Sequence, residues 1–385
     1  MKRRKLFFLV FYGLAFLVFL PACWDSRELD ELAIVLGVGV DREGDGLQLT
    51  AEIAKPGQMA GGKGGSSGSG GEPVFMTHGS GATVFDAARN ARSHSSRALF
   101  FPNNEVVVLG NDLAKQGIYP ALDFFLRDHE PRATAWVLVA EEKARDVFEA
   151  KDKLEDTNGL SLSSIIQQGS MSKIPGINVQ EVNAAMLDIT QAFLIPIVGV
   201  VEEGEDKHLK VDGNAGVFVK DKMVGEMNNR ETRGVKWVKG EIKSTSVVSH
   251  LIDEAGTMSS EIFLNKSSIK AVLDDGDPKV KVEIIVEGNI SDQSGTLDLS
   301  TEEGMIKANE STAQAIKKEV LQALGRAKSY NADVFGFGEV VGGVYPKEWQ
   351  KMKSSWQEIF PHLDVAVEVR VNLWRTGDVL RTVLQ

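Results

Sequence analysis

The chain has 385 residues, more than one hydrophobic core normally serves, so its length predicts two or three domains. It carries 43 Lys and Arg against 54 Asp and Glu, and the net charge of -11 argues against a general nucleic-acid binder, because phosphate contacts require a basic face. A single cysteine excludes a disulfide framework and any zinc site built on two or more thiolates.

Residues 1–22 have the features of a bacterial lipoprotein signal peptide. A basic segment at 2–5 precedes an uncharged run from Leu6 to Leu20, which is shorter than the ~20 apolar residues of a full membrane span. The run ends in the sequence LPAC, which resembles a lipobox, so we expect Cys23 to carry diacylglyceryl and N-acyl lipid and to become the first mature residue. The alternative is an uncleaved anchor helix, but the position of the only cysteine favours lipidation.

Such an anchor has consequences for where the protein resides. Two acyl chains give stable membrane residence, which one chain does not. Removal of residues 1–22 leaves 39 basic against 54 acidic residues, a net charge of -15. Anionic headgroups repel so acidic a body, so the lipid and protein partners, not a basic patch, are expected to hold it on the outer face of a membrane.

Residues 23–200 are predicted to form an N-terminal α/β domain, because strand and helix patterns alternate along them. A Gly/Ser-rich stretch at 55–72 cannot build a core and is predicted to be a mobile loop. The predicted elements are strands at 33–40 and 47–54 that form a hairpin, a helix at 83–98 capped by Thr83, a strand at 105–109, a helix at 112–127, a strand at 133–140 and helices within 141–190.

Residues 201–255 are predicted to form a small middle domain, and residues 256–385 a C-terminal α+β domain. Strands at 192–201, 213–220 and 223–227 precede a short helix at 229–238. Farther on, apolar and charged residues alternate along 280–290 and 365–373, which predicts long strands with one wet face, as in an antiparallel sheet. Helices predicted at 313–327 and 347–360 would cover the other face. The expected fold class is therefore α/β and α+β, with three mixed domains after the signal peptide.

The sequence evidence for catalytic or metal-binding residues is weak. Ser66 lies in a GGSSG sequence that matches a nucleophile elbow, but the strand and helix that such an elbow requires are missing from the pattern. The six histidines show no metal-ligand spacing. The cluster RDHE at 127–130 is a candidate site, although charges at a helix end usually pair locally or are solvated. The glycines at 37 and 39 precede a turn, which favours strand glycines over a phosphate-binding loop. No catalytic residue, metal site or cofactor is predicted.

The segment DVFGFG at 333–338 allows two interpretations. In the first, Phe335 and Phe337 pack between helices while the glycines allow a tight bend. In the second, the segment contacts a partner protein. We favour the structural interpretation.

The sequence CWDSREL at 23–29, followed by LAIV at 32–35 and GVGVD at 37–41, resembles the Ger(x)C family, the lipoprotein C subunits of spore germinant receptors. The resemblance continues through FDAAR at 85–89, SRALFF at 96–101 and VVVLG at 106–110, and recurs at GVF at 216–218 and DVFGFG at 333–338. It covers nearly the whole mature chain. The Gly/Ser tract at 61–71 is longer and simpler than the family leads us to expect.

The resemblance implies a three-domain mixed α/β lipoprotein on the outer surface of the spore inner membrane. It implies two polytopic partners, an A subunit and a transporter-like B subunit that binds the small-molecule nutrient. The C subunit is required for germination in response to nutrients and is not known as a catalyst. We therefore expect an extramembrane scaffold for the A and B subunits that clusters receptors through its acidic surface.

Two other functions remain open from the residues. A solute-binding lipoprotein of a membrane transporter would have two similar α/β lobes around a cleft, and the different periodicities of the first and third regions argue against it. A tethered hydrolase would need a converged nucleophile and base, and no free cysteine remains once Cys23 is acylated.

Overall fold

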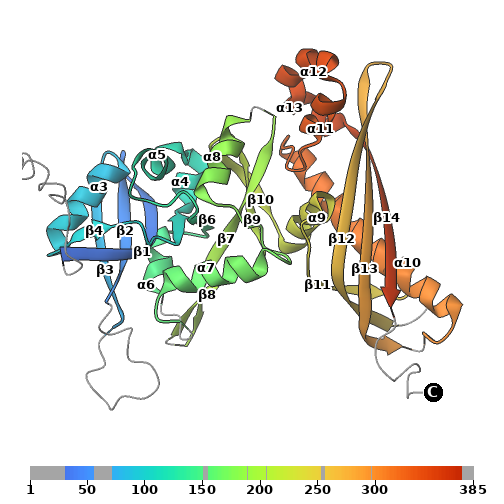
Figure 1. Cartoon of the computed structure of the whole chain (residues 1–385), viewed down its shortest axis with the longest axis horizontal. Helices are drawn as coiled ribbons and strands as arrows, with labels where there is room; N and C mark the ends of the chain where they lie inside the picture. Colours follow the sequence, from blue (N-terminus) through green and yellow to red (C-terminus); the bar gives the residue numbers. More distant parts are fainter. Residues whose placement is uncertain are drawn as a thin grey trace, which may run out of the picture.

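The computed structural model describes residues 31–55, 72–150, 155–188, 190–204, 206–252, 256–295 and 297–374. The strands of these residues form a ten-stranded sheet and a four-stranded sheet, which lie to the left and right in Figure 1. Helices accompany both sheets, so the predicted mixed α/β class is confirmed.

The first sheet has the strand order β10-β9-β7-β6-β5-β1-β2-β3, with β4 paired to β1 and β8 paired to β7. Its elements in chain order are β1 (Leu32–Glu43), β2 (Gly46–Ala54), β3 (Val74–Gly81), α3 (Val84–Ala91), η2 (Arg92–His94), β4 (Ala98–Phe100), β5 (Val106–Leu109), α4 (Asn111–Gln116), α5 (Tyr119–Arg127), β6 (Trp136–Ala140), α6 (Ala144–Glu149), α7 (Asn158–Gly169), α8 (Val179–Leu187), β7 (Ala192–Glu203), β8 (Asp206–Lys210), β9 (Ala215–Val219) and β10 (Lys222–Met227).

Both faces of the first sheet are covered by helices. Val107 and Leu109 of β5 belong to one apolar cluster, together with residues of α3, α4, α5 and α8. The alternate residues of the same strand, Val106 and Val108, belong to a second cluster with residues of α6 and α7. Because successive side chains of a strand point to opposite faces, the two clusters lie on the two sides of the sheet, as the unbroken apolar runs of its strands require.

The predicted hairpin of residues 33–54 is confirmed, since β1 and β2 pair antiparallel. Thr83 caps α3 as predicted, because its side chain accepts a hydrogen bond from the N–H of Asp86 at 3.2 Å. The helix predicted to reach residue 98 ends earlier, at Ala91, and residues 98–100 form β4 instead. The prediction of one continuous helix at 112–127 is also wrong. The segment is divided into α4 and α5 at Gly117, whose φ of 139° ends the first helix.

The second sheet has the order β11-β12-β13-β14. Its elements and their helices are α9 (Asn229–Lys239), β11 (Thr245–His250), β12 (Gly256–Asp274), β13 (Asp277–Gly295), α10 (Glu302–Ser329), α11 (Phe337–Val344), α12 (Pro346–Met352), η3 (Lys353–Ser355), α13 (Trp356–Ile359), η4 (Phe360–His362) and β14 (Asp364–Trp374).

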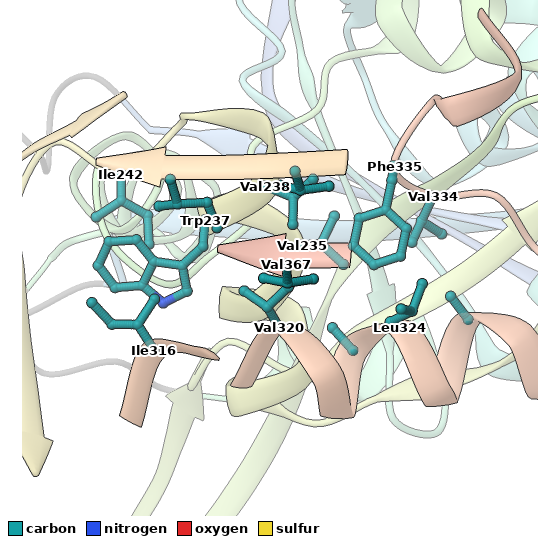
Figure 2. Close-up of a cluster of buried hydrophobic side chains, with 14 of the residues drawn as sticks. Val235, Trp237, Val238, Ile242, Ile316, Val320, Leu324, Val334, Phe335 and Val367 are labelled. Carbon is teal, nitrogen blue, oxygen red and sulfur yellow. The ribbon is translucent and has the colours of Figure 1, made fainter. Parts of the chain in front are cut away.

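One face of the second sheet packs against α9 and α10. Figure 2 shows Val235 and Trp237 of α9 beside Ile316 and Val320 of α10, with Val367 of β14 adjoining them. The opposite face carries charged side chains, so the predicted wet face is confirmed.

The expectation of an antiparallel C-terminal sheet is wrong for its last strand. β11–β12 and β12–β13 pair antiparallel, but β14 pairs parallel to β13. The reason is the connection between them, because the helices from α10 to η4 return the chain to the end at which β13 began. The single helix predicted at 347–360 is divided into α12, η3 and α13.

Residues 201–255 are shared between the two sheets. β9 and β10 extend the first sheet, whereas β11 pairs with β12 of the second and α9 packs against α10. The described strands of this region therefore form no sheet of their own, and the division of the chain into three domains stays a prediction.

Candidate functional site

The segment 333–338 surrounds a buried carboxylate. Asp333 is 2% exposed, and its Oδ1 accepts hydrogen bonds from the backbone N–H groups of residues 335, 336 and 337 at 3.0–3.2 Å. Its Oδ2 accepts from the N–H of Gly338 at 2.8 Å and from Nε1 of Trp356 at 2.9 Å. Burial raises the pKa of this carboxyl, while the N–H donors act in the opposite direction.

The structural interpretation of this segment is confirmed. Gly336 has a φ of 78°, which a glycine adopts without strain and which turns the chain into α11. Phe335 and Phe337 are buried and stacked, with ring centroids 5.0 Å apart. The carbonyl of Asp333 also accepts from the N–H of Ala192 at 3.0 Å, so the segment contacts the beginning of β7 in the first sheet.

A buried lysine makes a second contact between the two sheets. The ammonium of Lys236, on α9, donates to the carbonyls of Ser170 and Ile174 at 2.6 and 3.0 Å. Burial lowers the pKa of this lysine, and Glu241 at 4.0 Å partly compensates its charge. The backbone N–H of Lys243 also donates to the carbonyl of Met171 at 2.8 Å. The segment after α7 is therefore bonded to α9 and to the residues that lead into β11.

Two more buried carboxylates hold the helices of the first sheet. Asp41 of β1 accepts from the N–H groups of Ala144 and Arg145 at 2.8 and 2.9 Å, at the beginning of α6. Glu52 of β2 accepts from the first N–H groups of α7, at residues 158 and 159, at 2.8 and 2.7 Å. Burial raises the pKa of Glu52 to about 7 against the effect of these donors. Carboxylates at helix N-termini satisfy backbone donors that have no partner within the helix.

Helices α9 and α10 share a cluster of ion pairs. Glu319 of α10 forms an ion pair with Arg233 and accepts from Nε1 of Trp237 at 2.9 Å. Two turns farther along α10, Arg326 pairs with Glu231 at 3.0 Å. Both carboxylates are buried, so these pairs fix the crossing of the two helices in addition to their apolar contact.

The charged cluster at 127–130 adjoins a groove between α3 and α5. Arg127 pairs with Asp123 one turn earlier at 2.7 Å, and Asp128 accepts from the N–H of Glu130 at 2.9 Å. The charges thus pair locally. Phe85 and Tyr119 line the same groove and are about half exposed.

The remaining candidates are placed as follows. Cys23, Ser66 and the Gly/Ser tract lie outside the residues that the structure describes. Gly37 and Gly39 are strand glycines of β1, and a side chain at Gly37 would collide with the ring of Phe148 on α6. In the described part of the chain, no group of His, Cys, Asp and Glu side chains could hold a metal ion. Nor does any helix there combine the length and apolar character that a membrane crossing requires.

Sequence reasoning did not identify Asp41, Glu52 or Lys236. Asp41 and Glu52 bond to residues more than a hundred positions away, and Lys236 bonds to residues more than sixty positions away. The one available signal was a charged residue inside an apolar pattern, as at Glu52 in β2, where strand residues are otherwise buried.

The chain is similar to spore germination proteins over nearly its whole length. The family model for the spore germination protein N-terminal domain matches residues 25–200, and the model for the spore germination B3/GerAC-like C-terminal region matches residues 213–377. Spore germination protein KC of Bacillus subtilis (strain 168) is 28% identical over 381 residues, covering 94% of this chain and 93% of that protein. Spore germination protein YndF of the same organism is 26% identical over 396 residues, covering 94% and 95%.

A solved structure shares the fold. The crystal structure of the GerBC protein superimposes with a TM-score of 0.59 at 19% identity. The match covers 91% of this chain and 99% of that chain.

Proposed function

The chain belongs to the GerAC-like family of spore germination proteins, the C subunits of germinant receptors, and we propose that it is a non-enzymatic scaffold for the receptor's A and B membrane subunits. In this proposal the scaffold is needed for the germination response to nutrients, and a partner subunit binds the nutrient.

The observation that carries the proposal is the use of buried charge. Asp41, Glu52 and Lys236 each bond backbone groups of a distant segment, and Asp333 bonds the beginning of α11 and Nε1 of Trp356 on α13. Lys236 and the carbonyl of Asp333 also connect the two sheets. A body whose parts are joined in this way keeps its outer surfaces in a fixed arrangement, which suits a protein that holds other subunits in position.

We further propose that Cys23 carries diacylglyceryl and N-acyl lipid and anchors the chain on the outer face of the spore inner membrane. The LPAC sequence supports this assignment. The test is labelling of spore membranes with radioactive palmitate. The wild-type chain should be labelled and Cys23→Ala should not; a labelled Cys23→Ala chain would show the assignment to be wrong.

The scaffold is tested by recovery of the A subunit with a tagged B subunit from spore membranes. We expect recovery to fall in spores that lack this chain and to return when the wild-type chain is supplied. If spores that lack this chain lose the nutrient response but the A subunit is still recovered with the B subunit, the scaffold role is contradicted. The chain would then still be required for germination, but for another reason.

The alternative is a solute-binding lipoprotein of a membrane transporter. The different strand numbers and orders of the two sheets support the scaffold over a protein with two similar lobes. Equilibrium dialysis of the full-length chain against nutrient amino acids, sugars and nucleosides separates the two functions. Micromolar binding of one of these compounds would favour the solute-binding protein.

A further inference from the structure

Four strands end the two strand orders, and β14 is the longest of these outer strands. It contains 11 residues and pairs with β13 in continuous register from Asp364 to Trp374, without a bulge. The other outer strands, β11, β10 and β3, have 6, 6 and 8 residues, and β10 contains a register shift. Long regular edges are the ones that accept a further strand.

A helical side chain bonds the backbone of each of the other three outer strands. Arg233 of α9 donates to the carbonyl of Ser246 in β11 at 2.9 Å. The hydroxyl of Tyr330, at the end of α10, donates to the carbonyl of Glu226 in β10 at 3.2 Å. Asn90 of α3 donates to the carbonyl of Ser80 in β3 at 2.8 Å. Such contacts hinder the addition of another strand.

In the part of the chain that the structure describes, a contact of this kind occurs in β14 only near the C-terminal end of the strand. The N–H of Leu373 donates to Oδ1 of Asn309 on α10 at 2.9 Å, so it points away from β13. Because backbone direction alternates along a strand, the groups of Val367, Val369 and Val371 also point outward. Within the described residues, no hydrogen bond joins these three outward N–H groups to a helix or a loop.

The sequence at the centre of this edge is complementary to itself. Residues 367–371 read VEVRV, which is symmetric about Val369 except that Glu368 and Arg370 have opposite charge. In a second copy paired antiparallel about Val369, each Glu368 lies opposite Arg370 of the other copy, and Val367 lies opposite Val371. The charged pair is on the open face, where the side chains of Arg370 and Glu368 are 67% and 39% exposed. Opposite charges facing across strands stabilise their pairing.

We propose that β14 is a homotypic interaction surface through which two copies of this chain join their second sheets into one. The occupant is a second copy because the valines and the two charges of residues 367–371 match their own reversed order. Such a two-fold contact uses the same patch on both partners, and its backbone hydrogen bonds follow those of β-strand addition. The inference goes beyond the proposed scaffold function, since it depends only on the geometry and charge of β14.

Charge reversal at the two positions gives a test with an internal rescue. Glu368→Arg places Arg opposite Arg, and Arg370→Glu places Glu opposite Glu, so each variant alone should dimerise about tenfold more weakly than wild type. A mixture of the two variants places Arg opposite Glu at both positions and should dimerise again. Sedimentation velocity of the full-length chain in detergent micelles measures the three samples.

The controls separate pairing from folding. Lys270→Glu changes a charge on the same open face, but on β12, two strands away from β14, and should leave dimerisation through β14 unchanged. Circular dichroism should be the same for all variants. A wild-type chain that stays monomeric at about 100 μM, within the range of weak interfaces, would overturn the proposal. A dimer that both single variants retain would equally overturn it.

Discussion

The first sheet is covered by helices on both faces and the second on one, and charge is placed differently in the two. In the first sheet Asp41 and Glu52 are buried and bonded to helix N-termini. On the open face of the second sheet, Glu283 lies between Lys270 and Lys281 at 2.8 Å from each. A charge on a covered face requires fixed donors, whereas water supplies them on an open face. Burial, and not the number of ion pairs, should therefore set how much each charge contributes to stability.

The largest effect is expected at Asp333. This carboxylate is buried but does not belong to the first sheet, so it tests whether burial matters irrespective of the sheet. Asp333→Ala leaves the N–H groups of residues 335–338 and Nε1 of Trp356 without their acceptor. We expect a loss of about 4 kcal/mol in the free energy of unfolding, measured by urea denaturation. The matched variants Asp333→Asn and Trp356→Phe should lose less, about 2 and 1 kcal/mol, because each removes fewer bonds. Equal losses for all three would contradict this account.

The second prediction concerns the pH dependence due to Glu52. Its pKa rises from 4.5 in the unfolded chain to about 7 in the folded one, so the folded chain binds more protons between these values. The free energy of unfolding should therefore fall as the pH rises from about 4.5 to 7, with a contribution of about 3 kcal/mol from this group.

Glu52→Gln is the control for that slope. The variant cannot titrate at this position, so its stability should change less over the same pH window. Urea denaturation of both proteins at several pH values gives the difference. Parallel pH profiles would show that Glu52 titrates at its ordinary pKa.

A third, smaller effect is expected at the contact between the two sheets. Lys236→Met keeps the apolar stem but removes the donor to the carbonyls of Ser170 and Ile174. We expect a loss of about 2 kcal/mol and faster amide hydrogen exchange in residues 170–176. Lys239→Met, at an exposed position of the same helix, is the matched control and should change neither quantity. Exchange that increases equally in both variants would contradict a specific bond.

The smallest effect is expected on the open face. Lys270 and Lys281 lower the pKa of Glu283 to about 2, yet water solvates all three side chains. Glu283→Gln should therefore leave the midpoint of urea denaturation unchanged within error. A shift as large as that of Lys236→Met would show that the exposed ion pairs are part of what stabilises the second sheet.

Local pattern predicted many of the elements. Alternation along residues 280–290 and 365–373 corresponds to β13 and β14, and the apolar stripe along 313–327 lies within α10. Strand β12 was not predicted, because its outward residues mix serine, lysine and phenylalanine and give no clear period. The break between α4 and α5 was missed because one glycine within an apolar helical pattern is a weak signal.

By itself the sequence determined which segments form a core, the cap at Thr83 and the resemblance to a family of spore germination proteins, since these depend on neighbouring residues. Only the tertiary structure decided that β14 runs parallel to β13, that residues 201–255 are shared between two sheets, and that Asp41 and Glu52 hold α6 and α7. The reason is physical. Strand order and the partners of a buried charge depend on contacts between segments far apart in the chain, and no local period records them.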